Sequence, residues 1–324
     1  MTDLAPLIQA VRLAAILCRE VQRHHIIHSE KTGQEPVTIA DYGVQAILCR
    51  AIQQHFPGDA IIAEESGRQF AELVAPEQRR QIVQLVAGVL GQSVEEAQLI
   101  EWLDYGSVSS SVGLSRWWLI DPVDGTKGFL ALRHYVIAAG LVENGEPTAA
   151  VVGAPAFTKL DERGAVFYTD GDAGYMIPMS HRPDEAPHRL RVSEQRDPMQ
   201  MRALESVDKS HAAHERMAEV RDQVGMSREL VERIDSQEKY CRIAAGEAEL
   251  YLRLPRQAGG RPHMAWDHGP GTALVRAAGG TVTDVDGSPM NFMQGAVLKN
   301  QGIIATNGIV HDQVVEATQR VLQT

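Results

Sequence analysis

The sequence predicts a layered α/β (α+β) fold, in which helix and sheet layers alternate and two lobes enclose a cleft. Three observations support this prediction. Two amphipathic helix patterns open the chain, apolar segments joined by short turns fill its middle, and helix patterns alternate with short strands in its second half. The chain has 324 residues, 44% of them hydrophobic, which is enough for two lobes with substantial cores.

The first two elements are predicted to be helices. Apolar residues at three- and four-residue steps indicate an amphipathic helix over residues 4–21. Residues 24–36 are polar and end in Glu-Pro, so we expect a loop there. Helical spacing resumes over residues 37–48, and the Pro-Gly pair within residues 56–59 is typical of the turn that ends such a helix.

A short strand and a helical insertion follow. Residues 60–63 are apolar and lead directly into Glu64. Residues 68–116 have helical spacing and end in a polar loop, which indicates an inserted helical segment. Within it, Ser93 and Glu96 have the spacing of a capping box and predict the start of a further helix.

The middle of the chain is predicted to form one antiparallel sheet. Residues 117–120 are a continuous apolar strand, which we expect Asp121-Pro122 to end. Three further strand-like segments lie at residues 135–142, 149–153 and 165–168. Asn144-Gly145 has the composition of a two-residue hairpin turn between the first two of these.

The lobe boundary is expected near residue 185. Residues 180–188 are rich in Pro, Asp and His and poor in apolar side chains. A boundary there predicts an α+β lobe at residues 1–185 and an α/β lobe at residues 186–324. The first of these lobes contains most of the candidate metal ligands described below. In the second lobe, helix patterns at residues 210–224, 237–245, 269–278 and 310–323 alternate with strands at 250–254, 280–283 and 302–305. Such alternation predicts a sheet covered by helices.

Charge and cysteine content exclude several classes of protein. With 31 Lys and Arg against 42 Asp and Glu, the formal net charge of −11 disfavours a nucleic-acid polymer or an anionic membrane as a partner. The sequence has neither a signal-peptide pattern nor an apolar run near the roughly 20 residues of a membrane span. Cys18, Cys49 and Cys241 lack C-x-x-C spacing, which excludes a disulfide framework and a cysteine zinc site. We therefore expect a cytoplasmic location.

The sharpest local feature follows the strand at residues 117–120. Asp124 returns three residues after Asp121, so both carboxylates and the carbonyl of Val123 can converge on one hard cation such as Mg²⁺. Gly125 permits a tight backbone, and the amides of Gly125 and Thr126 are expected to bind phosphate. On its own, the segment is equally typical of an Asp-Gly turn with a capping Asp.

Two further acidic junctions favour the metal interpretation. Glu64-Glu65 follows the strand at residues 60–63, and Trp266-Asp267 precedes a helix that opens with glycine. Three strand-to-loop junctions that each present a carboxylate would build a multi-metal site in the cleft between the lobes.

Together with Pro-Val-Thr-Ile-Ala-Asp-Tyr-Gly at residues 36–43, these motifs resemble the inositol monophosphatase superfamily of lithium-sensitive, Mg²⁺-dependent phosphatases. The segments at residues 125–130, 207–211, 235–241 and 251–255 narrow the resemblance to the 3′(2′),5′-bisphosphate nucleotidases. It covers essentially the whole chain. It implies the family's layered fold, two or three Mg²⁺ ions, a role in sulfur metabolism, and hydrolysis of 3′-phosphoadenosine 5′-phosphate to AMP and phosphate. The related 3′-phosphoadenosine 5′-phosphosulfate is an expected second substrate.

The resemblance also implies roles for single residues. The implied metal ligands are Glu64, Asp121, the Val123 carbonyl, Asp124 and Asp267. Thr126, hydrogen-bonded to Asp41, is expected to orient and help deprotonate the attacking water. The implied nucleotide pocket consists of His211, Ser236, Lys239 and Arg253. Lys239 and Arg253 are expected to meet the second phosphate at a distance from the metals.

One segment departs from the family's pattern, and several alternatives stay open. Relatives commonly have Ala-Ala-Gly after Trp-Asp-His, where this chain has Gly269-Pro270-Gly271; we still expect a helix, because proline is tolerated in a first turn. The pairs His24/His28 and His211/His214 have zinc-like spacing but lack a third ligand. The rival functions are an inositol or sugar phosphatase of the same fold, which would not need Lys239 or Arg253, and a catalytically inactive nucleotide-sensing protein.

Overall fold

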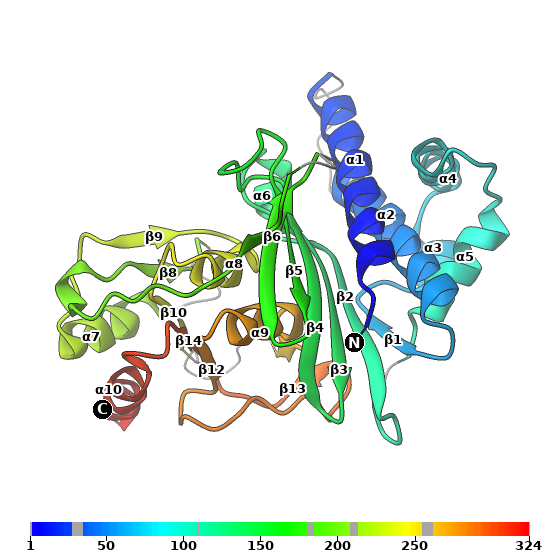
Figure 1. The fold of residues 1–324 in the computed structure, drawn as a ribbon. Helices are drawn as coiled ribbons and strands as arrows, with labels where there is room; N and C mark the ends of the chain where they lie inside the picture. The colour runs from blue at the N-terminus through cyan, green and yellow to red at the C-terminus, as the bar shows by residue number, and fades with distance from the viewer. Residues whose placement is uncertain are drawn as a thin grey trace.

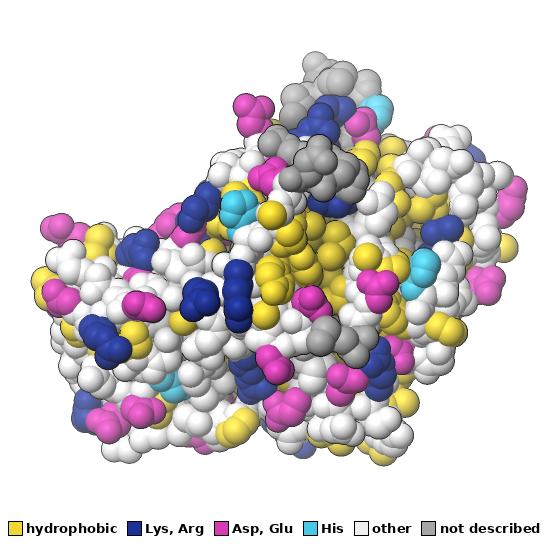
Figure 2. Space-filling model, viewed as in Figure 1, with side chains coloured by type: hydrophobic (Ala, Val, Ile, Leu, Met, Phe, Trp, Pro, Cys, Tyr) yellow, Lys and Arg dark blue, Asp and Glu magenta, His cyan; other side chains and the backbone are white. Residues whose placement is uncertain are grey.

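The computed structural model describes residues 2–27, 35–108, 110–180, 185–207, 213–254 and 262–323. Its helices and sheets form alternating layers (Figure 1), which confirms the predicted fold class. Within the described ranges, none of the helices is both long and apolar enough to cross a bilayer. On the face drawn in Figure 2, acidic and basic side chains are interspersed around a central apolar area.

Two long helices form the first layer. Helices α1 (Ala5–Ile27) and α2 (Glu35–His55) pack against each other and against one face of the first sheet. Leu7, Val11 and Cys18 on α1 are fully buried, which confirms the amphipathic pattern. The loop expected at residues 24–36 is wrong at both ends, because α1 continues through residue 27 and α2 begins at residue 35. The remainder of that loop, with His28, lies outside the described residues.

The first sheet has seven strands in chain order. They are β1 (Ala60–Ala63), β2 (Arg116–Asp124), β3 (Val136–Glu143), β4 (Glu146–Ala154), β5 (Ala165–Asp170), β6 (Ala173–Pro178) and β7 (His188–Arg189). Only the β1–β2 pair is parallel among these strands of the described chain. The hairpin at Asn144-Gly145 is confirmed, with φ of +52° and +84°, and residues 117–120 are buried in the strand as expected.

Strand β2 corrects one expectation. Asp121-Pro122 does not end the strand, because pairing with β3 resumes at Asp124 after a register shift. Pro122 has no N–H to donate, so the ladder is interrupted locally and then recovers. The irregularity therefore lies inside the strand, between the two carboxylates of the motif.

The insertion is helical, as predicted, but its capping differs. It contains α3 (Gly67–Leu73), α4 (Pro76–Leu90) and α5 (Glu96–Tyr105). The predicted capping box is wrong, because the N-cap of α5 is Glu95 and no side chain caps that helix end. Ser66 instead caps α3, where its Oγ accepts the N–H of Gln69 at 3.2 Å.

The second half forms the other layers. The second sheet has the order β12-β14-β10-β8-β9, with β8 (Ala203–Glu205), β9 (Val231–Arg233), β10 (Leu250–Arg253), β12 (Thr281–Thr283) and β14 (Ile303–Thr306). Helices α8 (Glu238–Ala244) and α9 (Gly269–Ala277) lie between the two sheets, whereas α7 (His214–Val224) and α10 (His311–Gln323) cover the outer face (Figure 1). The first sheet extends to β7, past residue 185, and the division into lobes stays a prediction.

Glycines allow α9 to lie directly against its neighbours. A Cβ on Gly269 would lie 2.4 Å from Leu119 Cδ1, and one on Gly271 would lie 2.3 Å from Tyr240 Cδ2. On the sheet side, a Cβ on Gly140 of β3 would lie 3.0 Å from Pro270. The departure at residues 269–271 is thus a packing feature that brings the start of α9, and Asp267 before it, close to β2.

We predict that Gly271→Ala destabilises the protein by about 2 kcal/mol, because the new methyl group overpacks a fully buried tyrosine ring. Gly88 in the last turn of α4 is the matched control, since a Cβ there meets nothing within 4 Å. Gly88→Ala should raise the free energy of unfolding by up to about 1 kcal/mol. Urea unfolding measures both, and equal effects of the two substitutions would contradict the packing argument.

Candidate active site

The acidic side chains singled out as metal ligands come from three places: Glu64 after β1, Asp121 and Asp124 in β2, and Asp267 before α9. Strands β1 and β2 are parallel, with Ala63 opposite Ile120, so the next residues of the two strands, Glu64 and Asp121, lie side by side. The packing of α9 brings the third junction close to them.

Desolvation raises the pKa of all four carboxyl groups, and repulsion between carboxylates adds to it at Glu64, Asp121 and Asp267. Desolvation and the neighbouring charges of Asp267, Glu65 and Asp124 together raise the pKa of Glu64 to about 8. Burial, followed by Asp124, raises the pKa of Asp267 to about 7. The pKa of Asp121 lies well above its usual range for the same two reasons. The four groups therefore interact with one another, although only Asp121 is buried, whereas Asp124 and Asp267 are partly buried and Glu64 is exposed.

The donor set fits a hard divalent cation. Asp121 is 2% exposed, and its Oδ1 has no hydrogen-bond partner among the described residues. Its carboxyl group is hydrogen-bonded to that of Asp267, which requires a proton between them. Within the described ranges, no three or more His, Cys, Asp or Glu side chains are arranged closely enough to hold a metal ion as they stand. A cation that replaced the shared protons would draw these oxygens together.

A buried glutamine that we did not predict fixes the loop after β1. Gln45 on α2 is fully buried; its Nε2 donates to Glu65 O at 2.6 Å, and its Oε1 accepts the Glu65 N–H at 2.9 Å. The Glu65 carboxyl group is hydrogen-bonded to Tyr42. These contacts bind Glu65 to α2. Glu64, the residue before it, is therefore the one that joins the carboxylate cluster. The sequence signal that could have indicated this role is the position of Gln45, a polar residue on the apolar face of its helix.

A second glutamine joins two of the acidic junctions. Gln237, which is 3% exposed, donates its backbone N–H to Asp124 Oδ2 at 2.6 Å. Its Nε2 donates to Trp266 O at 3.0 Å, next to Asp267. Gln237 lies within the segment at residues 235–241 that resembles the nucleotidases, but the sequence alone indicates no role for it.

The two residues expected to activate water are not in hydrogen-bond contact. Asp41 on α2 is buried, and burial followed by Glu64 and Glu65 holds its pKa well above the usual range. Thr126 is exposed at the first position of α6 (Thr126–Leu130), which contacts α2. Both residues are described, and the expected hydrogen bond between them is not formed. Their catalytic roles stay predictions.

The turn before α6 lies against the candidate nucleotide pocket. Gly125 has φ +94°, which glycine adopts without strain, and a Cβ there would lie 2.8 Å from Ser236 Cβ. Ser236 itself has φ +71°, an uncommon conformation for a residue with a side chain. Val123, whose carbonyl is the remaining predicted ligand, is buried in the same stretch of β2.

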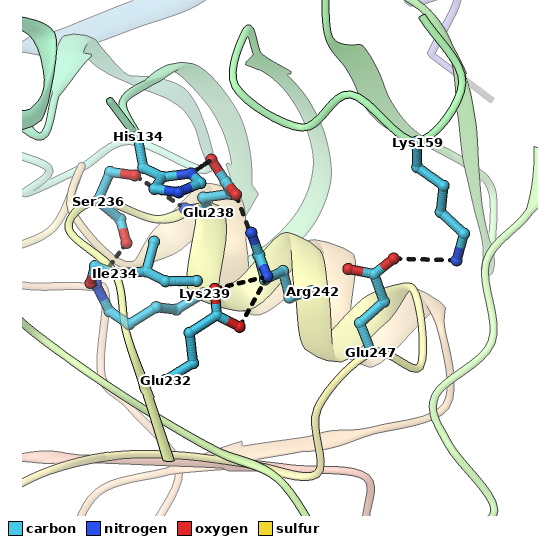
Figure 3. A network of polar contacts seen from close by, with 9 residues as sticks. All are labelled: His134, Lys159, Glu232, Ile234, Ser236, Glu238, Lys239, Arg242 and Glu247. Atoms are coloured by element: carbon cyan, nitrogen blue, oxygen red, sulfur yellow. Dashed lines mark hydrogen bonds and ion pairs between the residues drawn. The ribbon is translucent and has the colours of Figure 1, made fainter. Parts of the chain in front are cut away.

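Lys239 stands closer to the carboxylates than expected. Its side chain is buried, and Nζ donates to Ile234 O at 2.9 Å and to Ser236 O at 2.6 Å (Figure 3). Burial lowers the pKa of Lys239 to about 8, although Asp124 opposes the shift. The ammonium group of Lys239 thus stabilises the turn at Ser236 through hydrogen bonds to two backbone carbonyl groups. Arg253, at the end of β10, is only partly buried, and its charge lowers the pKa of Asp267.

The remaining histidines do not form a second metal site among the described residues. His211, the fourth predicted pocket residue, lies outside the described residues. His214 has a different partner, since its Nδ1 lies 2.9 Å from Glu205 Oε2. The buried Glu205 is also paired with Arg221, so this cluster is an ion-pair network within the fold.

Comparisons with known proteins match the whole chain. The inositol monophosphatase family matches residues 2–323. A Dictyostelium discoideum protein named 3′(2′),5′-bisphosphate nucleotidase is 31% identical, over 98% of this chain and 96% of its own. A Candida albicans protein named 3′(2′),5′-bisphosphate nucleotidase 2 is 30% identical, over 96% of this chain and 95% of its own.

Solved structures show the same fold at lower identity. The inositol monophosphatase (IMPase) of Thermotoga maritima has a TM-score of 0.62 and 21% identity, covering 100% of this chain and 99% of its own. The CysQ structure from Bacteroides thetaiotaomicron, with a TM-score of 0.57 and 19% identity, covers 93% of this chain and 96% of its own. With its layered fold and its buried carboxylates, the chain belongs to the inositol monophosphatase family and is a phosphatase.

Proposed function

We propose that this phosphatase uses Mg²⁺ to hydrolyse the 3′-phosphate of 3′-phosphoadenosine 5′-phosphate, giving AMP and phosphate. 3′-Phosphoadenosine 5′-phosphosulfate is the proposed second substrate. The observation that carries the proposal is the placement of Arg253 and Lys239 beside a buried carboxylate cluster in a chain of net charge −11. The names of the two relatives, each similar over nearly the whole chain, support the same substrate class.

The proposed metal ligands are Glu64, Asp121, the carbonyl of Val123, Asp124 and Asp267. Bound Mg²⁺ ions, two or three in number, would supply positive charge that screens the phosphate oxygens, favours ionisation of water and stabilises the leaving oxygen. The protein positions these oxygens through two parallel strands and the glycine-packed start of α9.

The other residues of the proposed mechanism bind the phosphate and move a proton. The backbone amides at Gly125 and Thr126 bind phosphate oxygens, and the Thr126 hydroxyl orients the attacking water. Asp41 accepts the proton of that water, for which its raised pKa is suitable. On the far side of the substrate, Arg253 pairs with the second phosphate, while Lys239 holds the Ser236 turn in place.

We predict that Thr126→Val and Asp41→Asn each lower kcat by about 10²-fold and change KM by no more than a few-fold. Help with proton transfer stabilises mainly the transition state, so its loss lowers kcat and leaves KM nearly unchanged. Thr148→Val is the matched control, since Thr148 is exposed on β4 and should leave both parameters unchanged. Phosphate release at saturating Mg²⁺ measures all three variants.

Asp41 has a competing structural role, because it is buried in α2. A thermal melt of Asp41→Asn separates the two roles. A large fall in melting temperature together with wild-type activity per folded molecule would refute the catalytic role of Asp41.

We predict that the wild-type protein prefers 3′-phosphoadenosine 5′-phosphate to inositol 1-phosphate. Arg253→Ala should raise KM for the nucleotide by about tenfold, or about 1.4 kcal/mol for a charge-assisted contact. Its effect on the inositol phosphate should be small, because that substrate has no second phosphate. Arg228→Ala is the control, since Arg228 is exposed and paired with Asp222.

Lys239→Ala should also lower stability, because Nζ holds two buried carbonyls.

Three results would overturn the proposal. Equal losses on both substrates in Arg253→Ala, or a wild-type preference for inositol 1-phosphate, would favour the sugar or inositol phosphatase. Phosphate release from neither substrate with Mg²⁺ present would favour a nucleotide-sensing protein.

A further inference from the structure

A row of polar side chains, His134, Glu238, Arg242 and Glu232, joins the turn after α6 to α8 and then to β9 (Figure 3). Nδ1 of His134 lies 2.9 Å from Glu238 Oε2, and the other oxygen of Glu238 accepts Arg242 Nε at 3.1 Å. Arg242 Nη1 also donates to the carboxylate of Glu232 at 3.0 and 3.1 Å. The Glu238 side chain is 0% exposed, whereas that of His134 is 32% exposed. An ionised carboxylate can only accept, so Nδ1 of His134 is the donor.

At one end, this row is attached to the phosphate-binding turn. The carbonyl oxygen of His134 lies 1.9 Å from where a Cβ on Gly128 would stand and 3.1 Å from that position on Gly125. The backbone of His134 is therefore packed directly against the turn that carries Thr126.

In its middle, the row fixes the start of α8. Glu238 is the first residue of that helix, and its N–H donates to Ser236 Oγ at 3.3 Å. Lys239, which follows it, holds the Ser236 carbonyl. The placement of Glu238 thus determines the placement of the Ser236 turn.

We propose that His134 and Glu238 are positioning residues that set the spacing between the phosphate centre and the nucleotide pocket. Gln237, just before α8, is bonded to Asp124 of β2 and to Trp266 before α9. The His134–Glu238 bond is the contact that joins the first residue of α8 to the segment after α6. It therefore sets the start of α8 relative to the phosphate-binding turn, and neither His134 nor Glu238 belongs to the proposed ligand or pocket residues.

This inference rests on the proposed function, because it concerns a substrate that must reach both places at once. A nucleotide bisphosphate gains affinity from its remote contacts only if the pocket and the phosphate centre are correctly spaced. A small phosphomonoester such as 4-nitrophenyl phosphate needs the phosphate centre alone. Loss of the His134–Glu238 bond should therefore change selectivity between the two substrates.

The test compares His134→Leu, which removes the donor, with His134→Asn, whose amide N–H can take the place of Nδ1. Lys159→Met is the matched control, because Lys159, between β4 and β5, forms another contact drawn in Figure 3, with Glu247 just after α8 at 3.0 Å. Glu238 keeps Arg242 as a partner in every variant, so the fold should persist.

For His134→Leu we expect KM for 3′-phosphoadenosine 5′-phosphate to rise about tenfold, with kcat and the hydrolysis of 4-nitrophenyl phosphate changed less than about threefold. His134→Asn should restore most of the affinity, and Lys159→Met should resemble wild type on both substrates. The melting temperatures of all variants should agree closely.

Wild-type KM in His134→Leu, or equal losses on both substrates, would overturn the inference while a wild-type preference for the nucleotide kept the proposed function intact. A wild-type protein without that preference would instead overturn the proposed function, and the inference with it.

Discussion

Four carboxyl groups that lie close together, with Asp121 buried at their centre, repel one another, and this repulsion is the constraint on which the rest of the site depends. Protons or cations must compensate it, because the protein limits the access of the water that would otherwise solvate the charges. The fold meets this constraint with oxygens from β1, β2 and the start of α9. Two buried glutamines, Gln45 and Gln237, hold the acidic loops through backbone and side-chain hydrogen bonds.

The layers converge at this site because α9 approaches both neighbouring elements very closely. Gly269 and Gly271 leave room for a leucine of β2 and a tyrosine of α8, which larger residues would displace. The same packing brings α8 and β10, with Lys239 and Arg253, to the cluster of carboxylates. The carboxylate cluster and the proposed nucleotide pocket are therefore both consequences of one helix position.

The sequence was sufficient to predict the helices and strands that bury one face. It was insufficient to predict features that depend on contacts between distant parts of the chain. The periodicity of α1 and the hairpin at Asn144-Gly145 are local, so both predictions were confirmed. Strands β7, β8 and β9 have two or three residues, too few to show a period. The acidic positions could be proposed because each belongs to a local sequence pattern: Glu64 follows a short apolar segment, Asp121 and Asp124 are three residues apart, and Asp267 precedes a helix that opens with glycine. The burial of Lys239 could not, because it depends on Asp124 and Tyr251, which lie on other elements.

The central claim is that a divalent cation holds the carboxylate cluster, and the melting temperature with Mg²⁺ and with EDTA tests it most directly. The raised pKa values of Glu64 and Asp267, about 8 and about 7, mean that the native metal-free protein keeps protons that the unfolded chain releases. Its stability should therefore fall as the pH rises from about 4.5 to about 8. Mg²⁺ should raise the melting temperature of wild type strongly at about pH 8.5 and weakly at about pH 6, and should do neither in Asp121→Asn. An equal rise in Asp121→Asn, or no rise in wild type at either pH, would contradict the account.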